Sequence, residues 1–492
     1  MVWVYLDGHS YNYEVYGLVR AFFNEDVEFI ESEEEHPYKG ILIKNNLIEN
    51  GSDLCSATSV LVDGDIVSKY KVNSIKSIDL KINSIEKKIK TGIKQSLYGA
   101  LSKIVKMKAP WGILTGVRPV KIVNELMDDG FDNTTIYDIL INEYKLYSEK
   151  AKLIIDIANT QRSFIYPMDK DKFSLYVSVP FCPTRCIYCS FPSNPIELVR
   201  NLVDDYTDSV VYELNNIKKV LQNKKIHTVY IGGGTPTSIP TRNLEKIIKT
   251  IYELFGRENI SEITVEAGRP DTINVDMLKM LKDNQIDRIS INPQTMNEKT
   301  LKTIGRFHTK KDIIDSFKLA RNMGFDLINM DLIVGLPGEG TDEIRYTLEE
   351  ISNLEPENLT VHTLAIKRGS KFVDHVSEYS LGDQDTINNC LKLCKTYAEH
   401  LKLSPYYLYR QKQMLGNFEN VGYAIKGKEC VYNILIMEEK ETIIAVGAGG
   451  VSKIFYPSEN RIERVPNVKG LHDYLNRTAE MVERKKYYID SI

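Results

Sequence analysis

The stretch FSLYVSVPFCPTRCIYCSF, residues 173–191, joins an apolar, β-branched run to three closely spaced cysteines. The run Ser174–Pro180 is typical of a buried strand. Cys182, Cys186 and Cys189 follow it with the spacing C-x3-C-x2-C. In a chain of 492 residues with seven cysteines, that spacing arises by chance in only about one of several hundred such sequences. The loop after this strand is therefore predicted to bind a metal ion or an iron–sulfur cluster.

Three thiolates in one loop can hold a metal or cluster and leave one coordination position open, whereas four close the site. Soft sulfur ligands favour zinc or an iron–sulfur cluster. Zinc sites usually pair one C-x2-C with a second distant pair, and the sequence has no second pair of that spacing. Cys55, Cys390, Cys394 and Cys430 are expected to pack as small apolar residues. A cluster is favoured, and structural zinc is the alternative.

Strand-like and helix-like segments alternate from Phe173 onward. Repeated β–α units predict an α/β fold with a parallel sheet and right-handed crossovers. Six units suit an incomplete (β/α)6 barrel, in which the active site lies beyond the carboxyl ends of the strands. The six predicted strands are Ser174–Pro180, His227–Gly233, Glu262–Ala267, Arg288–Asn292, Leu327–Val334 and Leu359–Ile366.

The remaining sequence suggests two flanking parts. Residues 1–165 are predicted to form an N-terminal α+β domain of unknown role, and residues 166–366 the barrel. Residues 367–492 are expected to form a C-terminal elaboration that packs on the barrel and covers the substrate. Within it the pattern predicts a helix near Gln384–Leu401, strands at Val431–Met437 and Thr442–Val446, and a helix at Leu471–Ile492.

Composition excludes several classes of protein. The chain has 63 basic and 67 acidic side chains and a formal net charge of −4. Affinity for nucleic acid or for anionic membranes needs an excess of positive charge, so neither partner is expected. No apolar run approaches the roughly 18 residues of a membrane span, and the N-terminus MVWVYLDGHSYNYEV does not read as a secretory signal. With seven cysteines arguing against a disulfide framework, a cytoplasmic protein is expected.

An aromatic residue, Tyr188, directly precedes the last cysteine of the triplet. With it, the spacing resembles the radical S-adenosylmethionine (SAM) superfamily. Further motifs recur in order: YVSVPFC (176–182), GGGTPT (232–237), TVE (264–266), Gln294, Arg306 and DLIVGLP (331–337). Together they resemble the oxygen-independent coproporphyrinogen III oxidases, also called dehydrogenases. The N-terminal extension together with HTLAIKRGS, YRQKQMLGNFENVGYA and VGAGGVSK resembles the HemZ branch of that family.

The resemblance implies that Cys182, Cys186 and Cys189 hold a [4Fe–4S] cluster whose fourth iron binds the amino and carboxylate groups of SAM. It implies oxidative decarboxylation of coproporphyrinogen III to protoporphyrinogen IX under anaerobic conditions. A 5′-deoxyadenosyl radical abstracts a β-hydrogen from a propionate, and carbon dioxide and an electron leave to give a vinyl group. Two propionates react, so two SAM are consumed, one or both of them bound at a time. A flavodoxin or ferredoxin is the expected electron donor.

The same resemblance implies which residues bind the cofactor. The turn 232–234 can approach the methionyl end of SAM closely because glycine has no side chain. Gln294 and Arg306 would bind the carboxylate and the ribose. Asp331 would accept from ribose hydroxyls, and Glu266 from a ribose hydroxyl or an ammonium group. The implied cofactor-binding positions are Tyr176, Tyr188, Gly233, Gly234, Thr235, Glu266, Gln294, Arg306, Asp331 and Ala365, the last matching a position that contacts the adenosine. No catalytic side chain is assigned.

Two positions depart from the family pattern. The family's cysteine two positions after the last ligand is Phe191, and the histidine two positions after Tyr176 is Ser178. Both lie near the expected substrate side, so two alternatives stay open. One is a haem-binding chaperone of the same superfamily, although the HNxxYW-like element of that branch is not present in this sequence. The other is a radical SAM enzyme acting on a different tetrapyrrole.

Coproporphyrinogen carries four propionates, and a chain without net positive charge must bind them with local cations. The candidate cations near predicted strand ends are Lys367, Arg368, Arg410, Lys412 and Lys453.

A glycine-rich run, Gly447–Gly450, superficially resembles a dinucleotide-binding loop. No clear helix follows it, so a Rossmann site is disfavoured.

Overall fold

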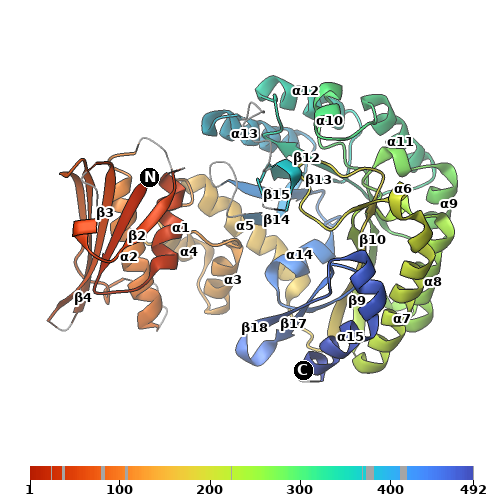
Figure 1. Ribbon diagram of the computed structural model, residues 1–492, viewed down its shortest axis with the longest axis horizontal. Coiled ribbons are helices and arrows are strands. Elements are labelled where there is room, and N and C mark those ends of the chain that lie inside the picture. Colours follow the sequence, from red (N-terminus) through yellow and green to blue (C-terminus); the bar gives the residue numbers. More distant parts are fainter. Residues whose placement is uncertain are drawn as a thin grey trace. The chain divides into compact units, whose positions relative to one another are not determined.

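The computed structural model describes residues 1–23, 25–35, 39–51, 53–78, 84–105, 109–222, 224–367, 369–372, 382–410 and 418–490. The chain divides into two compact units, Met1–Asn159 and Thr160–Ile492 (Figure 1). The predicted division into three parts, with boundaries at residues 165 and 366, remains a prediction about domain organisation. Of the described helices, none is long and apolar enough to cross a membrane.

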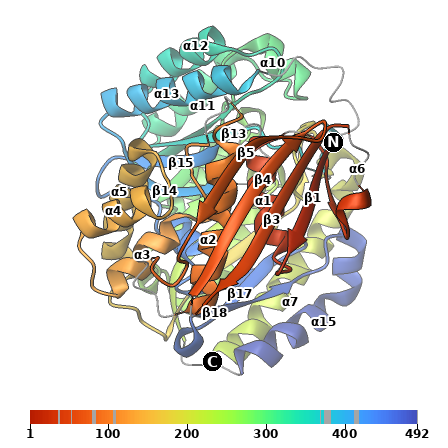
Figure 2. The same ribbon diagram turned by 90° about the vertical axis from the view of Figure 1, so that its left-hand side faces the viewer.

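The first unit combines a mixed sheet with helices. Its elements are β1 (Val2–Asp7), α1 (Asn12–Phe22), β2 (Val27–Ile30), β3 (Ile41–Asn50), β4 (Asp53–Val62), β5 (Asp65–Val72), α2 (Ile85–Leu101), α3 (Val120–Asp128), α4 (Asn133–Asn142) and the start of α5 (Ser148–Ile165). The strand order is β2-β1-β3-β4-β5, and the strands lie side by side in Figure 2. Asn45 Nδ2 donates to Thr58 Oγ1 at 2.6 Å and to Ser96 Oγ at 3.0 Å. These satisfied polar groups let α2 pack on the sheet.

The second unit is an α/β arrangement. Its strands are β6 (Lys172–Val179), β7 (Phe181–Cys182), β8 (Asn194–Pro195), β9 (Lys225–Gly233), β10 (Glu262–Val265), β11 (Arg288–Ser290), β12 (Ile328–Val334), β13 (Asn358–Thr363), β14 (Ser404–Arg410), β15 (Glu419–Ala424), β16 (Thr442–Val446), β17 (Val451–Tyr456) and β18 (Arg461–Pro466). Its helices are α6 (Ile196–Val199), α7 (Val203–Leu221), α8 (Thr241–Phe255), α9 (Val275–Asp283), α10 (Glu298–Thr303), α11 (Lys310–Asn322), α12 (Thr341–Ser352), α13 (Gln384–His400), α14 (Val431–Glu438) and α15 (Leu471–Ile489).

The six strands predicted from the sequence form the centre of one eleven-stranded sheet. Its order is β14-β15-β13-β12-β11-β10-β9-β6-β16-β17-β18. Each pair from β6 to β13 is parallel, which confirms the predicted α/β class. Helices α7 to α12 lie around the outside of these strands (Figure 1). The C-terminal strands extend the same sheet at both edges, with β15 antiparallel to β13 and β16 parallel to β6.

One predicted strand is wrong. The run Val431–Met437 forms helix α14 instead. A short run that is apolar except for one residue, Asn433, shows neither the alternation of a strand nor the period of a helix, so its surroundings decide its structure. Here the backbone N–H of Val431, at the helix start, donates to Glu262 Oε1 at 3.2 Å, which satisfies one of the donors that a helix leaves free. The helix ends where Glu439 adopts a left-handed conformation, with φ of 55°.

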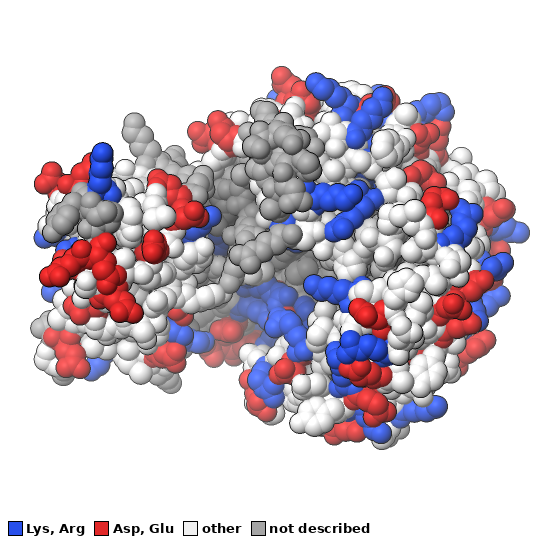
Figure 3. All heavy atoms as spheres, in the orientation of Figure 1, with Lys and Arg blue, Asp and Glu red and all other residues white. Residues whose placement is uncertain are grey.

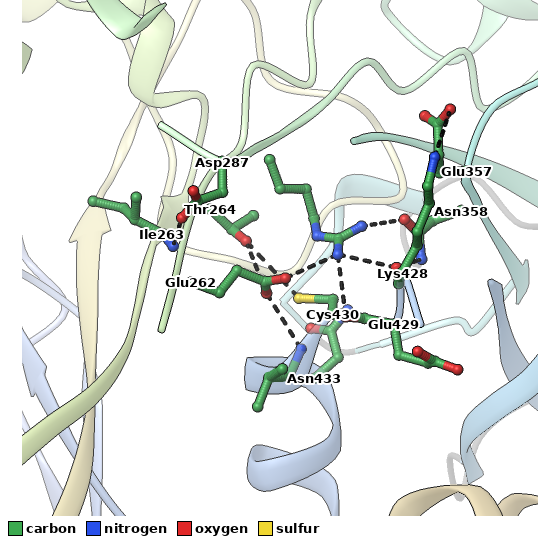
Figure 4. Close-up of polar contacts among 12 residues, drawn as sticks. Glu262, Ile263, Thr264, Asp287, Glu357, Asn358, Lys428, Glu429, Cys430 and Asn433 are labelled. Carbon is green, nitrogen blue, oxygen red and sulfur yellow. Dashed lines mark hydrogen bonds and ion pairs between the residues drawn. The ribbon is translucent and has the colours of Figure 1, made fainter. Parts of the chain in front are cut away.

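A buried arginine fixes the segment that leads into α14, and Figure 4 labels its partners Glu262, Asn358, Lys428 and Glu429. Arg288 Nη2 donates to Glu262 Oε2 at 2.8 Å and to the backbone oxygens of Lys428 and Glu429 at 3.0 and 3.1 Å. Arg288 Nη1 also donates to Asn358 Oδ1. Glu262, Arg288 and Asn358 are the first residues of β10, β11 and β13. The guanidinium therefore ties the amino ends of these strands to the approach of α14.

Replacing Arg288 with alanine is expected to lower the free energy of unfolding by about 3–5 kcal/mol, because buried Glu262 would keep its charge without an opposing charge. Denaturant unfolding followed by circular dichroism measures the change. The matched control is Arg242→Ala, which breaks an ion pair with Asp204 whose side chains are 75% and 65% exposed. It should cost less than about 1 kcal/mol. Equally small effects in the two variants would contradict the structural role of Arg288.

Candidate functional site

A cavity of about 350 Å³ lies where the parallel strands of the second unit end. Gly233 closes β9, while Glu266 and Gln294 follow β10 and β11. Because parallel strands run in one direction, residues at their carboxyl ends meet at one edge of the sheet. Of the ten predicted cofactor-binding residues, eight line this cavity: Tyr176, Tyr188, Gly233, Gly234, Glu266, Gln294, Asp331 and Ala365. Cys189 of the predicted cluster triplet lines it as well.

The cysteine loop packs against the glycine-rich turn. The Gly234 N–H donates to Val179 O at 3.0 Å, and the Thr235 N–H donates to Phe181 O at 2.7 Å. A Cβ on Gly234 would lie 2.5 Å from Phe181 O, so only glycine fits this approach. Thr235, one of the two predicted residues outside the cavity lining, donates from Oγ1 to Cys182 Sγ at 3.6 Å. The turn therefore supports the cysteines as well as shaping the cavity.

Arg306, the other predicted residue outside the lining, lies beside the cysteine loop. Thr184 Oγ1 donates to Gly305 O at 2.8 Å, which joins the loop to the segment that follows α10. Arg306 is buried, and its Nη1 donates to Asn292 O at 2.5 Å. Cys186 and Tyr188 are among the groups that raise the pKa of this guanidinium against the opposing effect of burial. The positive charge of Arg306 therefore lies beside Cys186 and Tyr188 of the cysteine loop.

A second buried cation near the cysteines, Arg269, was not predicted from the sequence. Its Nη1 lies 3.1 Å from Thr184 Oγ1 and 3.9 Å from Cys186 Sγ. Its Nη2 pairs with Asp271 Oδ2 at 2.7 Å. A cation beside a thiol favours the thiolate. One sequence feature could have indicated Arg269: it lies three residues after Glu266, at the same end of the sheet as the other site residues.

The two carboxylates of the cavity have opposite electrostatic environments. Burial raises the pKa of Glu266 to about 7, although Glu266 Oε1 accepts a hydrogen bond from Tyr230 Oη at 2.7 Å. Burial acts in the same direction on Asp331, but the neighbouring His362 imidazole, 3.7 Å away, and a hydrogen bond from Asn329 outweigh it and hold the pKa of Asp331 below its usual value. The Asn329 Nδ2 to Asp331 Oδ1 distance is 2.7 Å. The cavity therefore offers acceptors for hydroxyl and ammonium groups.

Gln294 is held in a backbone conformation that is uncommon outside glycine, with φ of 65°. Two hydrogen bonds to β12 fix it there, from the Gln294 N–H to Asp331 O and from the Ile333 N–H to Gln294 O, both at 2.9 Å. Strained residues that the surroundings over-determine are typical of functional sites. This strand-like bridge places the Gln294 side chain in the cavity lining.

Three tyrosines stack on one another beside the site, and two of them, Tyr176 and Tyr230, line the cavity. Tyr230 and Tyr432 have ring centroids 4.6 Å apart, and Tyr176 lies 6.2 and 6.1 Å from these two rings. Tyr432 comes from α14, the helix that was predicted as a strand, and its neighbour Asn433 lines the cavity. The position of α14 therefore sets part of the cavity wall.

Phe191 and Ser178, the two positions at which the sequence departs from the family pattern, lie in different surroundings. Phe191 lines the cavity and is 60% exposed. Ser178 is buried, and its Oγ donates to Ala448 O at 2.7 Å. The loop Gly447–Gly450 therefore packs on the end of β6. It leads into β17, which is antiparallel to β16, so it lacks the strand–turn–helix setting of a dinucleotide loop.

The candidate cations are distributed unevenly. Lys367 lines the cavity. Lys453 pairs instead with Glu439 at 3.1 Å. Arg410 is buried, and burial lowers the pKa of its guanidinium to about 10. Arg368 and Lys412 lie outside the described residues.

Comparison with known proteins agrees with this geometry. The radical SAM superfamily model matches residues 176–351. The oxygen-independent coproporphyrinogen-III oxidase-like protein HemZ of Bacillus subtilis is 38% identical over 421 residues, covering 85% of this chain and 84% of that protein. The chain belongs to the HemZ family of radical SAM proteins. The haem chaperone HemW of Lactococcus lactis is 32% identical over 320 residues, covering 64% of this HemZ-family chain and 80% of that protein. The structure of coproporphyrinogen III oxidase HemN from Escherichia coli matches with a TM-score of 0.51 at 21% identity, covering 66% of this chain and 73% of that one, and shows the same fold.

Membership of a radical SAM family implies a [4Fe–4S] cluster and SAM, and the cysteine loop fits the cluster. Burial raises the pKa of Cys182, and raises that of Cys189 to about 11, so both thiols need a cationic partner to ionise. Within the described ranges, no group of three or more His, Cys, Asp or Glu side chains is placed to hold a single metal ion. In a cluster each thiolate binds its own iron, so the sulfurs need not converge on one point. The neighbouring guanidinium groups of Arg269 and Arg306 offset the negative charge of the thiolates.

Replacing Cys186 with serine is expected to abolish cluster binding, because one of three thiolates in the loop is lost. Iron and sulfide analysis of protein reconstituted without oxygen measures the loss, together with the visible absorption of the cluster. Cys390→Ala, which changes a buried cysteine of α13, is the matched control and should retain full iron content. Normal iron and sulfide in the Cys186 variant would contradict the assignment.

Glu266 should make the stability of the cluster-free protein depend on pH. Its pKa rises from 4.5 to about 7 on folding, so its stabilising contribution is complete below about pH 4.5 and is lost as the pH rises through 7. Glu266→Gln keeps an acceptor for Tyr230 without this titration. Between pH 5 and pH 8 the wild type should lose about 2 kcal/mol of unfolding free energy relative to the variant. Parallel stability curves across that range would show that Glu266 ionises normally.

Proposed function

We propose that this chain is a radical SAM oxidoreductase that converts coproporphyrinogen III to protoporphyrinogen IX without oxygen. The observation that carries the proposal is the shared cavity, which brings Cys189 of the cysteine loop together with the strand-end residues expected to bind SAM. The name of the HemZ relative, which refers to coproporphyrinogen, supports the choice of substrate. A tetrapyrrole substrate and a flavodoxin or ferredoxin as electron donor are parts of the same proposal.

The chemistry of the proposed reaction balances for each propionate. One β-hydrogen atom is transferred to the 5′-deoxyadenosyl radical, carbon dioxide leaves, one electron passes to an external one-electron acceptor, and a vinyl group remains. Two propionates therefore consume two SAM. When bound, the cluster supplies the electron that cleaves SAM into methionine and this radical.

The chain's own residues position the reactants. Cys182, Cys186 and Cys189 would hold the cluster. The backbone of Gly233 and Gly234 lines the cavity and can approach the methionyl part of SAM closely. Glu266 and Asp331 would accept from the ammonium and hydroxyl groups of the cofactor.

The aromatic wall has a separate role in the proposed reaction. The rings of Tyr176 and Tyr230, which line the cavity and stack with Tyr432, give one side of it an apolar surface. Such a surface excludes water from the site at which a reactive radical would form.

A haem-binding chaperone is the second candidate. The likeness to HemW favours it, because the similar region covers 80% of that relative. Phe191 favours it as well, because this residue lines the cavity at the position where the coproporphyrinogen oxidases have a cysteine. An apolar ring at the entrance suits the binding of a flat tetrapyrrole.

Anaerobic incubation of the reconstituted protein with SAM, a low-potential reductant and coproporphyrinogen III tests the proposal. We expect protoporphyrinogen IX with two 5′-deoxyadenosine and two carbon dioxide per product, measured by mass spectrometry. The Cys186→Ser variant should form none of them. Deoxyadenosine without protoporphyrinogen would contradict the assigned substrate. Haem binding without any turnover would favour the chaperone, and a different porphyrin mass would favour another tetrapyrrole reaction.

A further inference from the structure

Lys367 is the only lysine or arginine among the described residues that line the cavity. Its side chain is half-buried, and no carboxylate pairs with it within the part of the chain that the structure describes. The other charged groups of the lining, Glu266 and Asp331, are acidic and belong to the proposed cofactor region. Over the face shown in Figure 3, basic and acidic side chains of the second unit are interspersed. The ammonium group of Lys367 is therefore the positive charge that an anionic ligand in the cavity would contact.

The backbone around Lys367 is tightly held. The Ser370 N–H and Ser370 Oγ both donate to Lys367 O, at 2.9 and 2.8 Å. These two hydrogen bonds fix the backbone from which the Lys367 side chain extends.

The same turn is attached to the cysteine loop. Arg185 Nη2 donates to Gly369 O at 2.7 Å, and the Phe372 N–H donates to Ile187 O at 3.0 Å. A Cβ on Gly369 would lie 3.6 Å from Ser190 O, so the two segments are in close contact. Arg185, Ile187 and Ser190 all lie within or next to the cysteine triplet. Any group that Lys367 binds is thereby placed beside the cluster loop.

Phe191 completes this corner of the cavity. The Lys367 ammonium lies 5.9 Å from the centroid of the Phe191 ring, within the range of a cation–π contact. The ring is largely exposed and offers an apolar surface next to the charge. A carboxylate carried on a hydrocarbon chain or ring matches this pair: the acid faces the ammonium and the apolar part faces Phe191.

We propose that Lys367 and Phe191 form the subsite that recognises a substrate carboxylate and places it beside the cysteine loop. This inference rests on the proposed function for the identity of the substrate as a tetrapyrrole propionate. It extends that function by naming the residue that distinguishes an acid from its neutral analogue.

Binding to coproporphyrin III, the stable oxidised tetracarboxylate, tests the inference separately from turnover. The reconstituted holoenzyme is titrated with this porphyrin and with its tetramethyl ester, and binding is followed by the porphyrin absorption. Lys367→Gln should weaken binding of the acid by about tenfold and leave binding of the ester unchanged. Lys367→Arg should stay within about threefold of the wild type, because it keeps the charge.

Lys371→Gln is the matched control, because Lys371 is an exposed lysine on the same segment. It should bind both porphyrins as the wild type does. Equal affinity of the wild type and Lys367→Gln for the acid would overturn the inference, and so would an equal loss for acid and ester. Charge-dependent binding by a wild type that makes no protoporphyrinogen would support the inference and contradict the proposed function.

Discussion

The parallel register of β6 and β9 is the constraint on which the site depends. Tyr176 pairs with Tyr230 and Val179 with Gly233, so the two strands end at the same level of the sheet. The cysteine loop leaves one strand and the glycine-rich turn leaves the other, and their backbones then hydrogen-bond directly. A shift of register by one residue would turn each side chain of β6 to the opposite face of the sheet. It would also separate the glycine turn from the loop that it supports.

The carboxyl ends and the amino ends of the parallel strands have different roles. At the carboxyl ends lie the cavity, its two carboxylates and the cysteine loop. At the amino ends, the Arg288 guanidinium ties strands to the segment before α14. This separation of stability from chemistry is general for parallel α/β folds. In this chain α14 connects the two ends, because its start is held by Glu262 and its Tyr432 and Asn433 contribute to the site.

Prediction from sequence succeeds where local pattern and chemistry agree. The six parallel strands follow from buried β-branched runs. Eight of the ten residues predicted to bind the cofactor line one cavity at the ends of these strands, and their role in binding stays a prediction. Prediction from sequence fails at α14, because a short apolar run has no periodicity to distinguish helix from strand. Arg269 was missed because its contact with Cys186 joins segments 83 residues apart. The likeness to HemZ relatives identifies the family, whereas the surroundings of Lys367 required the fold of the cysteine loop and the turn after β13.

The pairing of β16 with β6 has a consequence for how the protein is made. The Ser178 Oγ hydrogen bond to Ala448 O joins residues 270 positions apart, and β16 covers an edge of β6 that otherwise stays open. A ribosome delivers β6 long before β16, so this strand edge remains unpaired until most of the chain has been synthesised. An unpaired strand edge is a site for aggregation. The end of β6, from which the cysteine loop leaves, therefore gains its last neighbouring strand only after most of the chain has been synthesised.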